Sequence, residues 1–373
     1  MSGLSCANWN SLPFTEAVAD ETGGNRKVLQ RDYLSAGTLP VVDQGKGLIA
    51  GYTNDESAAC NVELPVVLFG DHTKEFKFVD FPFALGADGV KVLKPATDLD
   101  EKFLYHYLKQ VRLPGNAGYS RHFKFLKRER VPLPPLPEQK RIAAILDKAD
   151  EIRRKRQEAI RLTEELLRSA FLEMFGDPVT NPKGWEVRRL GEVGVLDRGR
   201  SRHRPRNDPA LLDGPYPLIQ TGDVANCDGE VREFSQSYSE LGLQQSRMWP
   251  KGTLCITIAA NIAKVGVLTF DACFPDSVVG FVPGRSVTTE FVQSWMQFLQ
   301  PALEAQAPHS AQKNINLQIL SNLLIPVPPT DSQMLYARLV RKAWASRTRA
   351  LDQARDLQWL RVSLELAAFT GRC

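Results

Sequence analysis

The sequence predicts an α+β protein with two globular domains, each followed by a long helix, and the two helices paired as an antiparallel coiled coil with an internal pseudo-twofold repeat. The main observation is a repeated junction: "VPLPPLPEQ" (131–139) and "IPVPPTDSQ" (325–333) lie at an offset of 194 residues. Each runs directly into a long segment without proline or glycine, which is typical of a helix. The chain is therefore expected to contain an internal duplication of one structural unit.

The first domain is expected over residues 1–135. Its short apolar run "LPVVLF" (64–69) is bounded by turn-forming residues, which indicates a strand. The segment "LDEKFLYHYLKQV" (99–111) has the apolar spacing of a helix. Strands and a helix in one segment indicate a mixed fold.

The first long helix is expected over residues 136–177. Each proline disfavours helical geometry in the residue before it, so the proline-rich approach is extended, and Pro137 suits a first helical turn. Apolar and small residues then recur at alternating steps of three and four, the spacing of a coiled-coil seam. The first row of this stripe is Ile142, Ala149, Arg156, Thr163 and Ala170, and the second row is Ile145, Ile152, Ala159 and Leu166. The positions that directly follow the second row add Leu146, Ile160, Leu167 and Met174.

The second domain is expected over residues 178–328 and the second helix over 329–373. "TLCITIA" (253–259) indicates a strand and "TEFVQSWMQFLQPAL" (289–303) a helix, as in the first half. At the same offset the second helix repeats the stripe, from Tyr336 and Leu339 onward. An isolated apolar stripe is not stable in water, so the two helices are expected to cover each other. The alternative is that each helix packs only on its own domain.

Composition is that of a soluble protein, with 43% hydrophobic residues and a formal net charge of +4. No apolar run is long enough for a membrane span, and the chain is expected to be cytoplasmic. The six cysteines are scattered without a C-x-x-C pair, and the five histidines show no metal-binding spacing. Neither a structural zinc site nor any other metal site is expected.

Several catalytic chemistries lack their motifs. There is no glycine-rich phosphate loop, and no Asn/Asp-Pro-Pro-aromatic element of an adenine methyltransferase. Asp71 and Glu75 resemble a magnesium-nuclease core only loosely, because a spacing of four is too short for ligands on separate strands. The chain is therefore expected to be non-catalytic and to bind no cofactor.

One segment has the composition of a nucleic-acid contact. Residues 198–206, "RGRSRHRPR", contain five arginines, and arginine forks bind both phosphates and guanine edges. The alternative is a solvated basic turn, or a loop paired with acidic residues of the chain itself. Together with weaker candidates, the predicted DNA-binding residues are Arg198, Arg200, Arg202, His203, Arg204, Arg206, Lys74, Lys77, Tyr119, Arg121, His122, Lys124, Gln312, Lys313 and Asn314.

Two similar domains separated by paired helices would hold two binding surfaces at a fixed spacing. Such spacing suits double-stranded DNA, where paired half-sites are separated by a defined distance. The alternative is a structural or adaptor protein whose two domains bind protein partners. Binding that weakens steeply with salt would favour the DNA reading.

The sequence also resembles a known family. "VPLPPLPEQKRIAAILDKAD", its weaker copy "IPVPPTDSQ", and "GDHTKEFKFVDFPFALGADGVKVL" (70–93) are similar to the specificity subunits of type I restriction-modification systems. The resemblance covers the whole chain, although the second junction has Thr-Asp-Ser-Gln where the first has Leu-Pro-Glu-Gln. It implies two target-recognition domains that read the halves of a bipartite DNA sequence. It also implies two modification subunits that use S-adenosylmethionine to methylate adenine N6, and separate restriction subunits.

Overall fold

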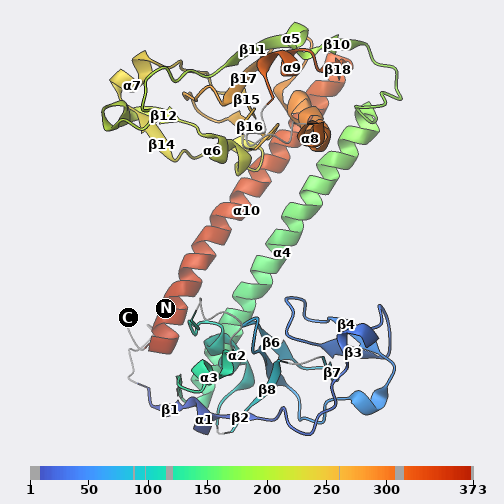
Figure 1. Ribbon diagram of the computed structural model, residues 1–373, viewed down its shortest axis with the longest axis vertical. Coiled ribbons are helices and arrows are strands. Elements are labelled where there is room, and N and C mark those ends of the chain that lie inside the picture. Colours follow the sequence, from blue (N-terminus) through green and yellow to red (C-terminus); the bar gives the residue numbers. More distant parts are fainter. Residues whose placement is uncertain are drawn as a thin grey trace. The chain divides into compact units, whose positions relative to one another are not determined.

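The computed structural model describes residues 9–86, 89–96, 98–114, 121–259, 261–306 and 315–370 (Figure 1). The chain divides into two compact units. Unit 1 comprises the described residues of Met1–Arg156 and Gln353–Cys373, and unit 2 is formed by Gln157–Asp352. Each unit therefore combines one domain with a part of both long helices. None of the helices in the described ranges is long and apolar enough to cross a membrane.

Two small sheets form the body of unit 1. One has the strand order β2-β8-β5-β6 and is antiparallel throughout, and the other has the order β4-β3-β7. β5 is fully buried, and it begins only at Val66 because Pro65 lacks the N–H that a ladder requires. The strands are β1 (Ser11–Pro13), β2 (Val18–Asp20), β3 (Leu39–Val42), β4 (Gly51–Thr53), β5 (Val66–Gly70), β6 (Phe76–Val79), β7 (Ala84–Leu85), β8 (Val90–Pro95) and β9 (Arg130–Pro132).

Helix α2 of unit 1 covers the first of these sheets. It is capped by Asp100, whose side chain accepts a hydrogen bond from the backbone N–H of Phe103, and it buries Phe103, Leu104 and Leu108. The predicted helix over 99–111 is thus present in shorter form. The helices and 3-10 turns of the unit are α1 (Phe14–Ala17), η1 (Gln30–Asp32), η2 (Glu56–Ala58), α2 (Glu101–Leu108), α3 (Phe123–Leu126) and the first part of α4 (Leu136–Phe175).

Unit 2 is built around a five-stranded sheet of order β11-β17-β15-β16-β13, with a separate β12-β14 pair beside it. Its core packs Phe281 and Ile256 of the sheet against Phe291 and Trp295 of α8. Its elements are β10 (Val187–Arg189), α5 (Leu190–Val193), β11 (Gly194–Arg198), η3 (Pro209–Leu211), β12 (Leu212–Leu218), α6 (Thr221–Ala225), β13 (Glu230–Val231), β14 (Gln236–Tyr238), α7 (Glu240–Gln244), β15 (Leu254–Thr257), β16 (Val265–Leu268), β17 (Val278–Pro283), α8 (Thr289–Gln306), α9 (Leu317–Ser321), β18 (Leu324–Pro326) and part of α10 (Thr330–Thr370).

The proline-rich junction has the same structure in both units. In unit 1 the approach strand β9 pairs antiparallel with β1, and in unit 2 the approach strand β18 pairs antiparallel with β10. Each approach strand ends at a proline and the long helix begins a few residues later. The repeated prolines therefore end a strand and turn the chain into a helix, as the sequence predicts.

A buried glutamine fixes each junction. The amide nitrogen of Gln139 donates to the carbonyls of Pro134 and Asp98 at 2.8 and 3.0 Å, and its oxygen accepts from the N–H of Asp100 at 2.7 Å. In unit 2, Gln333 binds its own junction in the same way: it donates to the carbonyls of Pro328 and Ser286, at 2.8 and 2.9 Å, and accepts from the N–H of Thr288 at 3.0 Å. Both side chains are fully buried. Besides three prolines, the glutamine is the residue that the two junction sequences have in common.

The buried stripe of each long helix differs from the predicted one. The first row is at least half-buried wherever it is described, and so are Leu146, Ile160, Leu167 and Met174 in the row that follows the second, whereas Arg153 in that row is exposed. The second row is half-buried only near the junctions; further along it is exposed at Ala159, Leu166 and Gln353. The assignment of this row to the seam is therefore wrong over much of both helices. A pair of helices buries one narrow face of each, and here that face is turned away from the second row.

Inside each unit the two long helices contact one another. In unit 1 a guanidinium nitrogen of Arg361 lies 2.7 Å from a carboxylate oxygen of Asp150 on α4, and the Phe369 ring of α10 also reaches the domain, where it packs edge-on against Phe103 of α2 at 5.4 Å between centroids. In unit 2 the Tyr336 ring packs edge-on against Phe171 at 5.6 Å, and the guanidinium of Arg347 lies 2.9 Å from Glu164.

An ion pair between domain and helix occurs in both units with its charges reversed. Lys102, the second residue of α2, lies 2.5 Å from Asp147 on α4. Glu290, the second residue of α8, lies 2.6 Å from Arg341 on α10, at the position equivalent to Asp147. Exchanging the helices between units would place like charges together at both sites. Partly exposed pairs of this kind are each worth about 0.2–1 kcal/mol, so they favour the correct pairing modestly.

His106 makes the stability of unit 1 depend on pH. Its imidazole is buried, which lowers its pKa below the usual 6.5, although the hydrogen bond to Asp147 at 2.9 Å partly opposes this. The unfolded chain therefore binds a proton as the pH falls through about 6.5 while the folded chain resists it. The lowered pKa of Asp147 acts in the same direction, but only in the acid range below its ordinary 3.8.

We expect the free energy of unfolding of unit 1 to fall between pH 7.5 and 5.5, by at most about 1.4 kcal/mol per pH unit for this single proton. Urea unfolding with hydrogen exchange across this range measures it. The variant His106→Gln, which cannot take up the proton, is expected to give a flatter pH profile. An equal slope in both proteins would contradict the assignment.

Candidate DNA interface

The arginine-rich segment forms an ordered loop of unit 2. It leaves β11 at Arg198 and ends before η3. Gly199 passes so close to the backbone carbonyl of Phe274 that an added Cβ would lie 2.1 Å from that oxygen, so only glycine fits. The N–H groups of Gly199 and Arg200 donate to the carbonyls of Val278 and Phe274 at 2.9 and 3.0 Å. The loop thus begins bound to the end of the central sheet.

The five arginine side chains of the loop differ in their contacts. Arg206 makes a two-pronged ion pair with Asp276 at 2.7 and 2.9 Å, and Arg204 donates to the carbonyls of Ser201 and His203 at 2.6 and 2.8 Å. Arg200 is exposed and lies only at the edge of contact with Asp197, at 3.9 Å. Arg202 is exposed, and its guanidinium makes no hydrogen bond or ion pair among the described residues.

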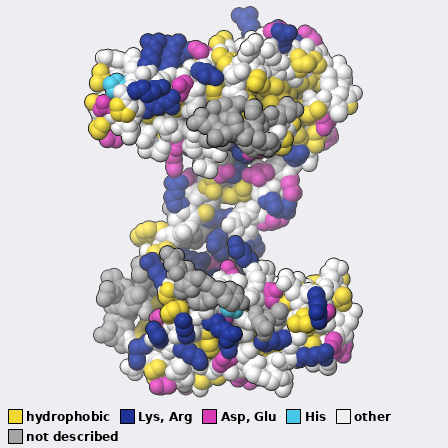
Figure 2. All heavy atoms as spheres, in the orientation of Figure 1, with side chains coloured by type: hydrophobic (Ala, Val, Ile, Leu, Met, Phe, Trp, Pro, Cys, Tyr) yellow, Lys and Arg dark blue, Asp and Glu magenta, His cyan; other side chains and the backbone are white. Residues whose placement is uncertain are grey.

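The remaining members of the loop have intermediate roles. Arg198 is half-buried within β11. His203 is exposed and its Nε2 lies 3.1 Å from a carboxylate oxygen of Asp208, whose pKa is lowered by a backbone hydrogen bond from Ala210 and by His203. Figure 2 shows basic side chains gathered on this unit beside a histidine. The prediction of an exposed basic loop is confirmed in its geometry, while Arg206 also fits the alternative of pairing with the chain's own acidic surface.

Sequence reasoning missed Arg247, which lies beneath the loop. Its guanidinium lies 2.6 Å from Asp197 and 4.1 Å above the centre of the Trp249 ring, which in turn stacks on Phe274. An arginine stacked on an indole and paired with a carboxylate is held in place from two sides. No local motif marks it, because its carboxylate partner Asp197 lies 50 residues earlier, on β11.

In unit 1 the two lysines of the β5-β6 hairpin lie in different environments. Lys74 is at the turn, in left-handed geometry with φ 64°, and its ammonium donates to the carbonyl of Pro114 at 2.7 Å. Lys77 is buried, and its ammonium donates to the carbonyls of Asp43 and Gly47. Burial lowers the pKa of Lys77, partly opposed by Asp43. This inward position speaks against Lys77 as a DNA contact, because its donors already serve the interior.

The other basic surface of unit 1 lies around α3. Arg121 and Lys124 are exposed as predicted, whereas His122 is buried. The carboxylate of the buried Asp71 accepts from the N–H of Phe123 at 2.6 Å and so holds the start of α3. Asp71 therefore has a structural role, which weakens its loose resemblance to a nuclease ligand. The surface gains two exposed residues that the prediction omitted, Lys127 and Arg128.

Four predicted residues, Tyr119, Gln312, Lys313 and Asn314, lie outside the described residues. Within the described ranges no three histidine, cysteine or acidic side chains come together as a metal site. Burial raises the pKa of the thiols of Cys60 and Cys227 to about 11 and that of Cys255 further. These cysteines are protonated at neutral pH, as expected of small core residues.

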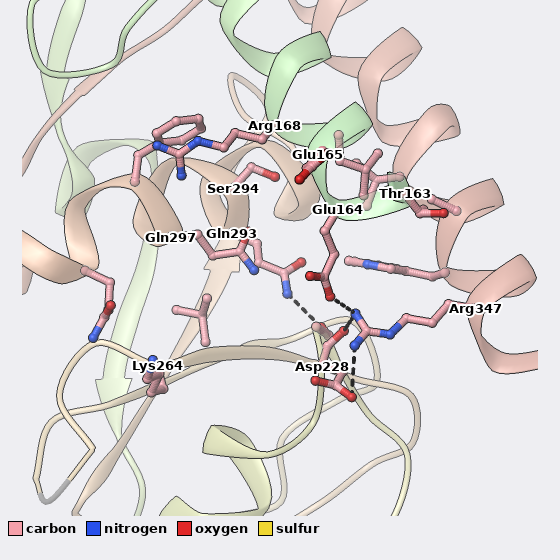
Figure 3. A pocket seen from close by; sticks show the side chains of 18 of the residues that line it. Thr163, Glu164, Glu165, Arg168, Asp228, Lys264, Gln293, Ser294, Gln297 and Arg347 are labelled. Carbon is pink, nitrogen blue, oxygen red and sulfur yellow. Dashed lines mark hydrogen bonds and ion pairs between the residues drawn. The ribbon is translucent and has the colours of Figure 1, made fainter. Parts of the chain in front are cut away.

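A cavity of about 520 Å³ lies in unit 2 where α8 meets the two long helices (Figure 3). Arg347 bridges Glu164 at 2.9 Å and Asp228 at 3.0 Å, and the amide of Gln293 donates to the carbonyl of Gly229 at 2.7 Å. Figure 3 shows these side chains pointing toward one another across the cavity wall. The shared arginine ties Asp228 of the domain to Glu164 of α4, so the cavity has the character of a structural junction.

Comparisons with known proteins agree with this architecture. The family model of the type I restriction modification DNA specificity domain matches twice, at residues 21–162 and 182–342. The EcoR124I/EcoR124II specificity subunit of Escherichia coli is 30% identical over 354 residues, which cover 89% of this chain and 85% of that protein. A putative MjaX specificity subunit of Methanocaldococcus jannaschii is 23% identical over 252 residues, 62% of this chain and 55% of that protein.

Among solved structures, the S subunit of a type I restriction-modification system from M. genitalium superposes with a TM-score of 0.71. The match covers 97% of this chain and 96% of that one, at 15% identity, and it shows a shared fold. Each family match takes in one domain, its junction glutamine and the first part of the following helix, up to residue 162 on α4 and residue 342 on α10. The chain belongs to the DNA specificity subunits of type I restriction-modification systems.

Proposed function

We propose that this chain is a non-catalytic subunit that gives a restriction-modification complex its DNA sequence specificity, each recognition domain reading one half of a bipartite target in double-stranded DNA. The observation that carries the proposal is the duplication itself. Two domains of different surface chemistry are attached to two long helices through the same glutamine-fixed junction. A duplicated frame with dissimilar basic surfaces suits two different half-sites.

Within unit 2 the arginine loop is the reading element. Arg200 and Arg202 extend exposed forks, and Arg198 and His203 flank them. Such forks bind phosphates and the O6 and N7 acceptors of guanine. In unit 1 the equivalent surface is formed by four exposed residues around α3, Arg121, Lys124, Lys127 and Arg128, together with the half-buried Lys74 at the β5-β6 turn.

The four segments are a first recognition domain, a spacer helix, a second recognition domain and a second spacer helix. The helices form an antiparallel coiled coil with pseudo-twofold symmetry, and they set the length of unread DNA between the half-sites. Support comes from the contacts inside each unit, where late residues of α10 meet early residues of α4 (Arg361 with Asp150), and early residues of α10 meet late ones of α4 (Tyr336 with Phe171).

The helices also dock the partners of the complex. Two modification subunits, which bind S-adenosylmethionine and methylate adenine N6, attach to the junctions and spacer helices, and restriction subunits join the full complex. Leu162 and Leu166, one turn apart on α4, and the adjacent Met334 and Leu335 on α10 are exposed apolar neighbours, and they support a docking role because adjoining exposed apolar side chains are typical of an interaction surface.

Replacing the five arginines of the loop with serine is expected to abolish recognition of one half-site and leave the other intact. The loss of charged forks removes the contacts to bases and phosphates, whereas the fold of unit 1 does not depend on them. Co-expression with the cognate modification subunit, followed by mapping of N6-methyladenine along the genome, measures both half-sites at once.

The matched control replaces two exposed basic residues of unit 2 outside the loop and the long helices, Lys251 and Arg285, with serine and is expected to keep the full motif. A bipartite motif in the wild type that survives unchanged in the loop variant would refute the loop as reader. Absence of any new methylation from an assembled wild-type complex would instead favour an adaptor that binds proteins.

A further inference from the structure

The backbone of the arginine loop is held by a short segment that follows helix α7. The side-chain oxygen of Gln245 accepts hydrogen bonds from the N–H groups of Arg202 and His203, at 2.5 and 3.0 Å. The hydroxyl of the next residue, Ser246, donates to the carbonyl of Arg200 at 2.9 Å. Two adjacent side chains therefore fix the stretch from Arg200 to His203, which has no regular secondary structure.

This segment is itself rigidly placed. Helix α7 is capped by Ser239, whose hydroxyl accepts from the N–H of Gly242 at 3.2 Å. Gly242 packs so tightly that a Cβ would lie 2.3 Å from the carbonyl oxygen of Leu211. Arg247 then fixes the other end through Asp197 and Trp249. Gln245 lies between these anchors, so its amide has a defined position relative to the central sheet.

The contacts divide the loop into two functional parts. Arg204 and Arg206 use their forks on the chain's own carbonyls and on Asp276, so they shape the far side of the loop. Arg200 and Arg202 have their backbones fixed by Ser246 and Gln245, while their forks are exposed: that of Arg202 makes no hydrogen bond or ion pair among the described residues, and that of Arg200 only the long contact with Asp197 at 3.9 Å. A fixed backbone with an exposed fork is what bidentate recognition of a base edge or phosphate requires.

We propose that Gln245 is a positioning residue for DNA recognition, which presents Arg200 and Arg202 to the half-site read by unit 2. This inference rests on the proposed function. A single acceptor oxygen that takes two backbone N–H groups fixes two consecutive peptide units, and with them the directions of both side chains. Gln245 contacts the loop and not the DNA, so its effect is on base discrimination through the arginines.

The chemistry of Gln245 provides a sharp test. Its amide nitrogen is buried and has no hydrogen-bond partner among the described residues, so the acceptor oxygen performs its role alone. Gln245→Met keeps the length of the side chain and removes the acceptor. Gln245→Glu keeps an acceptor of the same length and loses no hydrogen bond, so it is the conservative variant that should rescue the loop. The neighbouring Gln244→Met is the matched control, because Gln244 is exposed and its side chain makes no hydrogen bond with the loop among the described residues.

The experiment uses the assembled complex of this chain with its modification subunits and measures binding to duplex libraries randomised at one half-site at a time. We expect Gln245→Met to lower base discrimination at one half-site by about tenfold or more, the value of one good bidentate contact, and to leave the other half-site unchanged. Gln245→Glu is expected to restore that discrimination, although its added negative charge weakens total affinity. Gln244→Met should behave as the wild type.

Unchanged discrimination in Gln245→Met, or equal loss in Gln245→Met and Gln245→Glu at the same half-site, would overturn the role assigned to Gln245. Equal loss at both half-sites would also overturn it, since that result means a general loss of folding or assembly. A wild-type complex that shows no bipartite preference would reject the proposed function itself. Failure of the proposed function and failure of this inference are therefore distinguishable.

Discussion

The variant Gln139→Ala is expected to destabilise unit 1 by about 3 kcal/mol or more, and Gln333→Ala to destabilise unit 2 by a similar amount. Each substitution removes the partner of one N–H and two carbonyls, one carbonyl in a buried hydrogen bond and the other two groups in part-buried ones, and a buried group left unsatisfied costs about 1–3 kcal/mol. Removing a fully buried side chain also leaves a cavity. Hydrogen exchange, which reports local opening, measures the two units separately.

Two further substitutions serve as controls for the alanine variants. Gln157→Ala changes an exposed glutamine on the same helix and is expected to have an effect within about 0.5 kcal/mol. Gln139→Glu is expected to be as damaging as the alanine, because a carboxylate cannot donate to the two carbonyls that now accept from the amide. A cost below about 1 kcal/mol for both alanine variants would mean that the junctions do not depend on the glutamines.

The repeated junction could be predicted from the sequence because proline and glycine act locally. Their positions predicted both helices, which begin at Leu136 and Thr330 and run without a break. The role of the glutamine could not be predicted. It binds backbone groups up to 47 residues away, such as the carbonyl of Ser286, and backbone groups have no side-chain signature in the sequence.

The prediction of the DNA-binding residues succeeded where charge alone determines that a side chain is exposed. It failed where packing in the folded protein determines which side chains are exposed. Five arginines among small residues could hardly be buried, and most of them are exposed. Lys77 looks equally basic in the sequence, yet it alternates with apolar strand residues and points inward, where the carbonyls of Asp43 and Gly47 receive it. Gln245 carries no charge and belongs to no motif, so only the fold reveals its contact with the loop.

The seam of the helices was mispredicted for a related reason. The spacing of apolar residues shows that a helix has a buried stripe. It does not show whether the first row is buried together with the second row or with the row that follows the second, because both of these contain apolar residues. Leu166 is apolar and exposed, whereas Arg347 is charged and largely buried because Glu164 and Asp228 pair with it. Which row is buried therefore depends on the residues that each side chain contacts, and not on the hydropathy of the side chain alone.

Lengthening both spacer helices by one heptad is expected to lengthen the unread gap of the recognised DNA motif by about three base pairs. The units divide between Arg156 and Gln157 on α4 and between Asp352 and Gln353 on α10. Inserting copies of residues 150–156 and 346–352 at these two points adds about 10.5 Å to each helix and keeps the heptad stripe in phase. With a rise of about 3.4 Å per base pair, this length corresponds to three pairs.

The methylation motif of the co-expressed complex measures the outcome directly. Both half-site sequences are expected to remain unchanged, because every contact of the arginine loop and of the α3 surface lies within one unit. The unmatched control, a heptad added to α4 alone, forces two extra turns to loop out beside an α10 of the original length, and methylation is expected to be lost. An active matched variant that keeps the original gap would show that the helices do not set the spacing, and the two recognition domains would then have to be positioned by the partner subunits.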